Sequence, residues 1–144
     1  MIEARKVARV MGGRRVLGCE IRSAIDLDRL VREGLPKVAL LHVAHHAAAT
    51  PGAANRLAYA VASRATIERK TKKLGPLHSV RTEHLARLVA LAEEVWGDAG
   101  EARAWLNAPH PELGGRTPVA AAMTGVGARA AEEALMRGAH GLPL

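Results

Sequence analysis

Three closely spaced histidines raise the question of a metal site. His42, His45 and His46 lie at positions i, i+3 and i+4, so a helix would place their imidazoles on one face. A zinc-protease motif requires glutamate directly after the first histidine, and Val43 stands there instead. No cysteine or carboxylate lies nearby in the sequence to complete a ligand set. We therefore expect no metal ion here, and a small enzyme that uses these histidines is the least favoured interpretation.

Signatures of catalysis and of cofactor binding are also missing from the sequence. It contains no Gly-x-Ser-x-Gly segment, no glycine-rich phosphate-binding loop and no local pairing of cysteine with histidine. The glycines and arginines of residues 12–15 do not have the form of a P-loop, and Glu93-Glu94 are interpreted as surface charge on a helix. We predict no catalytic residues, no cofactor and no enzymatic activity.

Composition favours a helical protein of the cytoplasm. The 144 residues include two tryptophans, one tyrosine and no phenylalanine, so Leu, Val and Ala must fill the core. Cys19 is the single cysteine, so no disulfide can form within the chain, and we expect its small side chain to be buried or half-buried. We find no signal peptide and no apolar stretch near the roughly 20 residues that span a bilayer. These observations predict a cytoplasmic protein that does not bind the membrane.

Positive charge gathers in the first half of the chain. Residues 1–79 hold 15 Lys and Arg against 6 Asp and Glu, whereas residues 80–144 hold 6 against 8. All five lysines lie at or before Lys73. The asymmetry predicts two domains with this boundary, a DNA-binding front half with an N-terminal arm and a back half with another role. Chance solubilising charge is the alternative.

The basic segment has the pattern of a helix-turn-helix. Thr50-Pro51 predicts the start of a helix that runs to Tyr59, residues 60–62 form a tight link, and Ser63 can cap a second, basic helix over residues 64–73. Such a helix can enter the major groove, where its first residues reach base edges and the others neutralise phosphates. The predicted DNA-binding residues are Arg64, Thr66, Arg69, Lys70, Lys72 and Lys73, the last two assigned to phosphate. The alternative is the solvated face of a helical bundle.

Further helix signals surround this motif. In chain order, the front half should add an extended segment or arm over residues 7–22, a short helix that Asp26 or Asp28 caps and Gly34 ends, and a helix over residues 36–48. The back half should hold a joint over residues 77–81, an amphipathic helix over 82–96, a helix over 98–106 capped by Asp98, a short helix from Thr117-Pro118, and a last helix that Thr124 caps and Gly138 ends. Together they predict an all-α protein of roughly six to eight helices.

The run from Trp105 to Pro118 is rich in residues that restrict the backbone or permit unusual shapes. It holds three prolines and a glycine pair, so it fixes a backbone shape, which we interpret as a docking surface. The predicted structural residues are Trp105, Leu106, Leu113, Gly114, Gly115 and Pro118, and those left to meet a partner are Pro109, Pro111 and Arg116. A turn buried between helices is the alternative.

At this run the chain resembles the toxin-binding domain of the Xre/MbcA/ParS antitoxins. The matching residues are Trp105-Leu106, Pro109, Leu113 to Pro118, Thr124, Gly127 and His140-Gly141, preceded by Glu93 to Asp98 and Ala102. Upstream, Val16-Leu17-Gly18 and Arg32 to Pro36 resemble the start of that family's Xre-like DNA-binding half, so the resemblance extends from about residue 10 to the end.

The resemblance implies a two-part antitoxin of a type II toxin–antitoxin system. Its front half would bind operator DNA and repress its own operon. Its back half would silence a RES-domain toxin, an enzyme that attacks NAD or transfers ADP-ribose, by obstructing the active site. The toxin-binding positions carried over are Pro109, Arg116, Thr117, Arg129, Arg137, His140 and Gly141.

A homodimer is expected, and a higher hetero-oligomer with the toxin, because helix-turn-helix proteins commonly span palindromic half-sites. The alternative is a plain helix-turn-helix transcriptional regulator without a toxin partner, whose back half serves oligomerisation.

Overall fold

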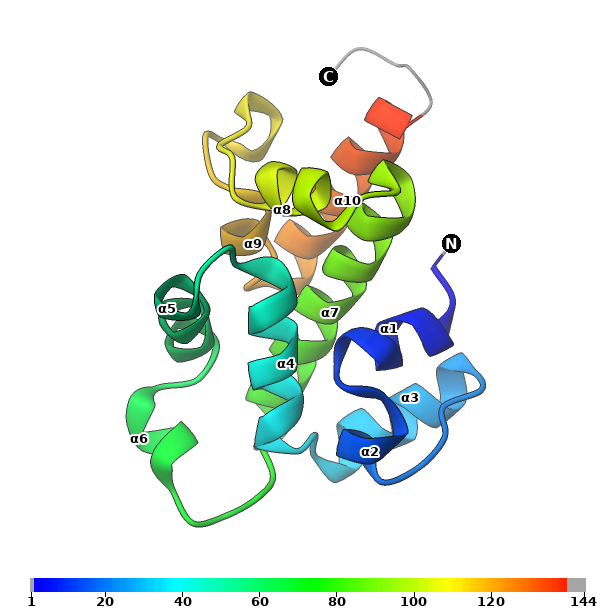
Figure 1. Ribbon diagram of the computed structural model, residues 1–144, viewed down its shortest axis with the longest axis vertical. Coiled ribbons are helices and arrows are strands. Elements are labelled where there is room, and N and C mark those ends of the chain that lie inside the picture. Colours follow the sequence, from blue (N-terminus) through cyan, green and yellow to red (C-terminus); the bar gives the residue numbers. More distant parts are fainter. Residues whose placement is uncertain (1, 140–144) are drawn as a thin grey trace.

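The computed structural model describes residues 2–139, which form an array of helices (Figure 1). In chain order these are α1 (Ala4–Val10), α2 (Gly13–Leu17), α3 (Ala24–Glu33), α4 (Lys37–Ala47), α5 (Pro51–Val61), α6 (Arg64–Glu68), α7 (Pro76–Trp96), α8 (Ala99–Leu106), the 3₁₀ helix η1 (Pro111–Leu113), α9 (Pro118–Ala121) and α10 (Gly125–Ala139). The described residues form no strand, only an isolated antiparallel bridge between Pro36 and Lys73. The expected all-α class is confirmed. None of these helices is long and apolar enough to cross a membrane.

Helix α7 is the central element of the fold. Figure 1 shows α4 beside it on one side, α1 and α3 on the other, and α8 and α10 packed toward its upper end. Leu85, Leu88 and Val89 of α7 are completely buried, so this one helix supplies core to both halves of the molecule. Gly97 ends it in the left-handed conformation (φ 68°), as glycine does at no steric cost.

The predicted joint over residues 77–81 is wrong, because α7 begins at Pro76 and continues through it without interruption. Proline is well suited to the first helical position, where its missing N–H costs nothing. The first turns are then tied down by hydroxyls. Ser79 Oγ accepts a hydrogen bond from the Leu35 backbone N–H (3.0 Å), and Thr82 Oγ1 donates to the His78 carbonyl (2.7 Å).

The N-terminal residues are helical, so the expectation of an extended segment or arm over residues 7–22 is wrong. Val7, Val10 and Met11 recur at helical spacing and are almost completely buried, because α1 packs against α7. The turn into α2 uses Gly12 in a left-handed conformation (φ 107°).

Most helix starts and ends follow the predicted local signals. Thr50, Asp98 and Thr117 each accept a hydrogen bond from the backbone N–H three residues later, at 3.1, 2.8 and 3.1 Å. Thr124 does the same for Gly127 (3.0 Å). Gly34 ends α3 as expected.

The start of α3 and the end of α10 also differ from prediction. Helix α3 starts earlier, with Ser23 as its cap, and the Asp26 carboxylate instead accepts a hydrogen bond from the Arg22 backbone N–H (3.0 Å). That hydrogen bond lowers the pKa of Asp26. At the other end of the chain, α10 continues through Gly138 to Ala139, so Gly138 does not end it.

Small residues let the helices of the back half approach closely. Gly127 is the tightest case, since a Cβ there would overlap the Ala121 carbonyl at the turn from α9 into α10. Buried alanines line this region, among them Ala121, Ala122, Ala128 and Ala131. Cys19 is exposed, against expectation, because it lies in the turn that follows the last buried residue of α2, Leu17.

Candidate DNA-binding and partner-binding surfaces

Helices α5 and α6 form the predicted helix-turn-helix, at the left of Figure 1. Ala54, Ala58 and Val61 form the buried face of α5, which packs against α4. The turn is short: Ala62 ends α5, and Ser63 caps α6 by accepting a hydrogen bond from the Thr66 backbone N–H (3.3 Å). The motif therefore holds α6 at the surface of the front half.

The second helix is shorter than predicted. It ends at Glu68, so Arg69, Lys70, Lys72 and Lys73 lie in the loop before α7, and the prediction of a basic helix to residue 73 is wrong. The reason lies in α4, where the Lys37 ammonium donates hydrogen bonds to the carbonyls of Ile67 (2.8 Å) and Arg69. These bonds satisfy the carbonyls that end α6.

A second contact holds the basic loop in place. The Lys37 backbone N–H donates to the Lys72 carbonyl (2.9 Å), and the Leu74 N–H donates to the Leu35 carbonyl (2.8 Å). Together with the bridge between Pro36 and Lys73, these bonds hold residues 72–74 against the start of α4. Leu74 is buried, so the loop is anchored while its lysines remain exposed.

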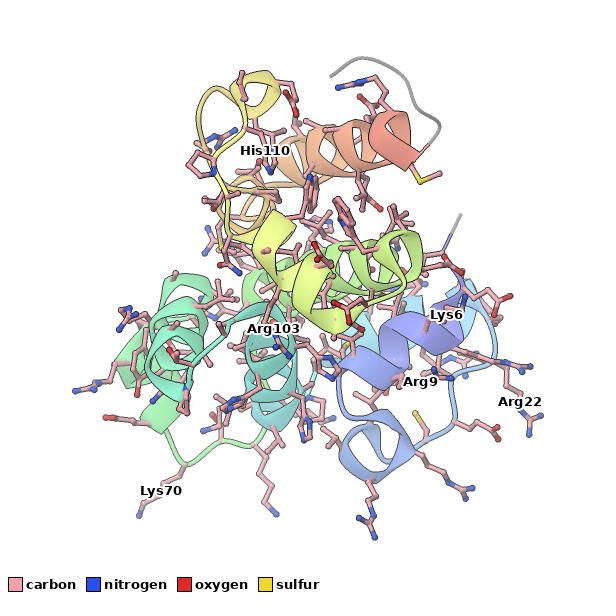
Figure 2. All side chains as sticks on the ribbon, turned by 45° about the horizontal axis from the view of Figure 1, so that its top comes forward. Lys6, Arg9, Arg22, Lys70, Arg103 and His110 are labelled. Carbon is pink, nitrogen blue, oxygen red and sulfur yellow. The ribbon has the colours of Figure 1, made fainter. Side chains whose placement is uncertain are left out.

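The cations of this surface point to solvent. The side chains of Arg64, Arg69, Lys70, Lys72 and Lys73 are exposed. Lys70 extends away from the molecule in Figure 2, whereas Arg64 lies over the Tyr59 ring (5.0 Å to its centroid) and pairs with Glu68 (3.6 Å). Thr66 is half-buried and its hydroxyl bonds that of Ser63 (3.0 Å), so it serves the cap of α6 first. The loop, more than the helix, presents unpaired positive charge.

The proline-glycine run folds into a closed elbow, residues 107–117, between α8 and α9. The His110 N–H donates to the Arg116 carbonyl (3.1 Å), and the Gly115 N–H donates back to the His110 carbonyl (3.0 Å). Gly114 (φ 67°) and Gly115 (φ 80°) both adopt the left-handed conformation that this reversal requires. Leu106, Leu113 and Pro118 are buried beneath the elbow and Trp105 is half-buried. The shape of the elbow is therefore fixed by its own backbone.

An apolar hollow of about 430 Å³ lies beside the elbow. Both tryptophans line it, together with His110 from the elbow and residues of α7 and α10, namely Val95, Ala134, Leu135 and Gly138. The His110 ring packs on Trp105 with centroids 5.2 Å apart, and its Nε2 lies 3.2 Å from the Trp105 carbonyl oxygen. Trp96, the last residue of the predicted amphipathic helix over residues 82–96, is 45% exposed. Tryptophan is enriched among the residues that contribute most to protein–protein binding.

Comparison with known proteins agrees with this division into two surfaces. Residues 26–90 match the profile described as the antitoxin Xre-like helix-turn-helix domain, and residues 91–141 match the antitoxin Xre/MbcA/ParS C-terminal toxin-binding domain. The chain belongs to the Xre/MbcA/ParS antitoxin family. It is 28% identical over 125 residues to a Pseudomonas putida protein named Antitoxin Xre, a match that covers 87% of this chain and 78% of that protein.

The predicted toxin-binding residues of this antitoxin fall into separate groups. Pro109 and Arg116 are exposed on the elbow, and Thr117 uses its hydroxyl to cap α9. Arg129 is exposed on α10 and Arg137 is half-buried there. His140 and Gly141 lie outside the described residues.

Helix α10 separates two of these groups. Its residues Ala134 and Gly138 face the hollow beside the elbow, whereas Arg129 lines a different hollow of about 320 Å³ with Arg87 and Leu91 of α7. Positions 129 and 138 are nine residues apart, which places them on opposite faces of a helix. The antitoxin therefore does not bring Arg116 and Arg129 together on one face.

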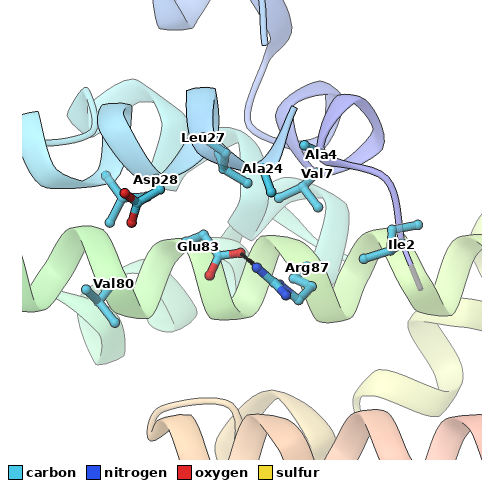
Figure 3. A pocket seen from close by; sticks show the side chains of 10 residues that line it. Ile2, Ala4, Val7, Ala24, Leu27, Asp28, Val80, Glu83 and Arg87 are labelled. Atoms are coloured by element: carbon cyan, nitrogen blue, oxygen red, sulfur yellow. Dashed lines mark hydrogen bonds and ion pairs between the residues drawn. The ribbon is translucent and has the colours of Figure 1, made fainter. Parts of the chain in front are cut away.

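A carboxylate lies in that second hollow. Burial raises the pKa of Glu132, and nearby Glu83 raises it further, while Arg87 and Arg129 act in the opposite direction. Arg87 is also paired with Glu83 (2.9 Å) on the next turn of α7. Figure 3 shows this pair on α7 at the edge of another hollow, of about 260 Å³, beneath α1 and α3.

Polar contacts join the two halves of the antitoxin. Arg103 Nε of α8 donates to the His46 carbonyl (3.2 Å), and the amide of Asn107, which directly follows α8, donates to the Ala47 carbonyl (2.7 Å) at the end of α4. The His46 ring pairs with Glu93 of α7 (3.1 Å). We call Arg103 and Asn107 the clamp. Sequence reasoning missed it, because nothing local links residues about 60 positions apart.

The histidine cluster of α4 is thus partly used in structural contacts. His42 and His45 are exposed and His46 faces Glu93. Within residues 2–139, no three His, Cys, Asp or Glu side chains lie close enough together to hold a metal ion.

Proposed function

We propose that this antitoxin neutralises a RES-domain toxin, an enzyme that attacks NAD or transfers ADP-ribose, by obstructing its active site, and that it represses its own operon. The elbow carries the proposal. It is a preorganised loop that displays Arg116 and Pro109 beside an apolar hollow with an exposed tryptophan. Because its backbone is already fixed, binding costs little conformational entropy.

The chemistry of these groups suits a cleft that binds NAD. The diphosphate of NAD is anionic, so such a cleft is expected to attract a guanidinium that can occupy the same place. Arg116 is exposed, and its Nε–H donates to the Leu113 carbonyl (3.4 Å), which leaves its two terminal nitrogens to meet a partner. Trp96 and Trp105 would bury apolar area around this contact. Arg137 of α10 is also part of the proposed site. The remaining predicted positions, His140 and Gly141, lie outside the described residues.

On the DNA side, we place the operator against α6 and the basic loop. Arg64 and Thr66 stand on the helix that would enter the major groove, and Arg69, Lys70, Lys72 and Lys73 would neutralise phosphates. We further propose a cytoplasmic homodimer that spans palindromic half-sites, joins the toxin in a hetero-oligomer, and has no enzymatic activity of its own.

Co-expression tests the toxin half of the proposal. A neighbouring gene for a RES-domain protein should arrest growth and deplete NAD when expressed alone, and this chain should restore both. The triple variant Arg116→Ala, Arg137→Ala, His140→Ala should fail to rescue and should lose the toxin in a pull-down. The matched control Arg29→Ala, Arg32→Ala, Arg56→Ala removes three exposed cations of the front half and should rescue fully. Normal toxin binding by the first variant would refute the assignment.

The same experiment separates the second candidate function. A plain transcriptional regulator would bind DNA through the helix-turn-helix, and no neighbouring gene would be toxic without it. The family's toxin-binding domain favours the antitoxin.

A further inference from the structure

The first 25 residues precede the segment that matches the helix-turn-helix profile, and they are strongly basic. They hold six Lys and Arg against two acidic residues, Glu3 and Glu20. No acidic residue lies between those two, so α1 and α2 carry only positive charge. The proposed function gives this charge no role.

This basic segment is a fixed part of the front half. Val7, Val10 and Met11 bury α1 in the core, and α2 packs against α4, the same helix whose Lys37 holds the basic loop. The turn at Gly12 is tight, since a Cβ there would lie 3.1 Å from Cδ2 of His42 on α4. The position of α2 relative to the helix-turn-helix is therefore set by packing.

Two arginines of α2 are exposed and unpaired. Arg14 and Arg15 make no ion pair or side-chain hydrogen bond with any residue in the described part of the chain. Lys6 and Arg22, by contrast, are paired with Glu94 and Glu20. A pair of adjacent guanidinium groups without carboxylate partners is available to an anion.

The position of α2 indicates which anion. In Figures 1 and 2, α2 and the loop between α6 and α7 lie along the same lower edge of the molecule, on either side of α4. Figure 2 shows nitrogen-tipped side chains pointing outward from α2 at this edge, as Lys70 does from the loop. The edge that carries the basic loop, where we place the operator, therefore also carries α2.

We propose that Arg14 and Arg15 bind backbone phosphates of the operator, as a second anchor beside the helix-turn-helix. The inference rests on the proposed binding of DNA by the front half. Phosphate contacts carry no sequence information, so this anchor supplies affinity and orientation rather than specificity. It extends the DNA-binding surface beyond the family's helix-turn-helix domain, to a part of the chain that the profile does not include.

The test is the salt dependence of binding to a DNA fragment from the promoter of the antitoxin's own operon. Each phosphate contact contributes about 0.9 to the slope of log affinity against log salt. The double variant Arg14→Ala, Arg15→Ala should lower the slope by about 2. Between 50 and 200 mM salt, the unaltered protein should then lose about ten times more of its affinity for DNA than the variant loses. Arg14→Lys, Arg15→Lys should keep most of the slope, because lysine still pairs with phosphate.

The matched control is Arg5→Ala, Arg9→Ala, which removes the same charge from α1. Arg9 lies with Glu93 and Glu94 near the far end of α7, whose start adjoins the basic loop, and α7 is about 30 Å long. Glu93 and Glu94 beside Arg9, and Glu3 beside Arg5, offset the positive charge that this control removes, so it should leave the slope nearly unchanged.

The outcomes separate the two ideas. If the unaltered protein does not bind the promoter fragment, the proposed function fails in its DNA-binding half. If it binds and the Arg14, Arg15 alanine variant matches either the unaltered protein or the control, only the second anchor is overturned. A variant that binds DNA normally but loses the toxin in a pull-down also overturns it, since the surface would then belong to the toxin.

Discussion

At the scale of single residues, two of the side chains predicted to contact a partner serve the fold first. Thr66 completes the cap of α6 and Thr117 that of α9, although both were predicted to meet a partner. Arg116 and Lys70 remain exposed. A substitution at Thr117 would therefore disturb α9 as well as any contact, so it does not test toxin binding cleanly.

Glu132 supports a prediction about pH. Burial is the main reason why its pKa is raised, so the folded state binds a proton more tightly than the unfolded state, whose pKa is near 4.5. The contribution of Glu132 to the stability of the fold is therefore fully present below about pH 4.5, and it is lost as pH rises through the raised pKa. Glu132→Gln removes the charged form and should raise the melting temperature at pH 7 by about 1–3 °C, a small effect because solvent screens a half-buried group.

Thermal unfolding at two pH values checks this. At pH 7 the Glu132→Gln variant should be more stable than the unaltered protein, and near pH 4 the difference should disappear. Glu133→Gln, an exposed neighbour on α10, is the control and should change little at either pH. A Glu132→Gln variant that is less stable at pH 7 would mean that attraction to Arg87 and Arg129 outweighs desolvation.

At the scale of elements, the end of α6 decides how the front half can meet DNA. Lys37 holds the carbonyls of Ile67 and Arg69, so the basic residues after Glu68 sit on an anchored loop instead of a recognition helix. In the proposed complex with the operator, base reading would rest on the few side chains of α6, and phosphate binding would rest on the loop.

The loop supports a prediction about salt. Arg69→Ala, Lys70→Ala should weaken operator binding and flatten its salt dependence by about 2 in slope, because two phosphate contacts are lost. Both side chains are exposed, and the Arg69 carbonyl that Lys37 holds is unaffected, so the fold should survive. Filter-binding titrations over a range of salt concentrations measure the slope. Unchanged affinity and slope would argue against placing this loop at the duplex.

At the scale of the whole molecule, the two halves share one core helix and a polar clamp. Helix α7 contributes buried leucines to both halves, and Asn107 of the back half satisfies the Ala47 carbonyl at the end of α4. The antitoxin should therefore unfold in one transition, because neither half can lose its structure without exposing part of α7.

Removing the clamp residue Asn107 tests this coupling. Asn107→Ala leaves the Ala47 carbonyl without that donor and should lower the free energy of unfolding by about 1–2 kcal/mol. Urea denaturation measures it. Asn55→Ala, at an exposed position of α5, is the matched control and should cost well under 1 kcal/mol. Equal losses in the two variants would show that the clamp contributes nothing.

The sequence by itself determined the features that depend on near neighbours. The caps at Thr50, Ser63, Asp98 and Thr117 and the glycine that ends α7 were predictable, because each signal is satisfied within three or four residues. The family could be inferred for the same reason, since the elbow residues form one continuous string.

Only the tertiary structure decided the features that depend on distant partners. Lys37 ended α6, packing on α7 made the N-terminal residues helical, and the packing of α8 and α10 around the end of α7 left Trp96 partly exposed. The rotation of α10 likewise set Arg129 apart from the elbow. Each of these features depends on contacts between residues that are far apart in the chain. A pattern of neighbouring residues carries no information about such contacts, so the sequence alone could not predict them.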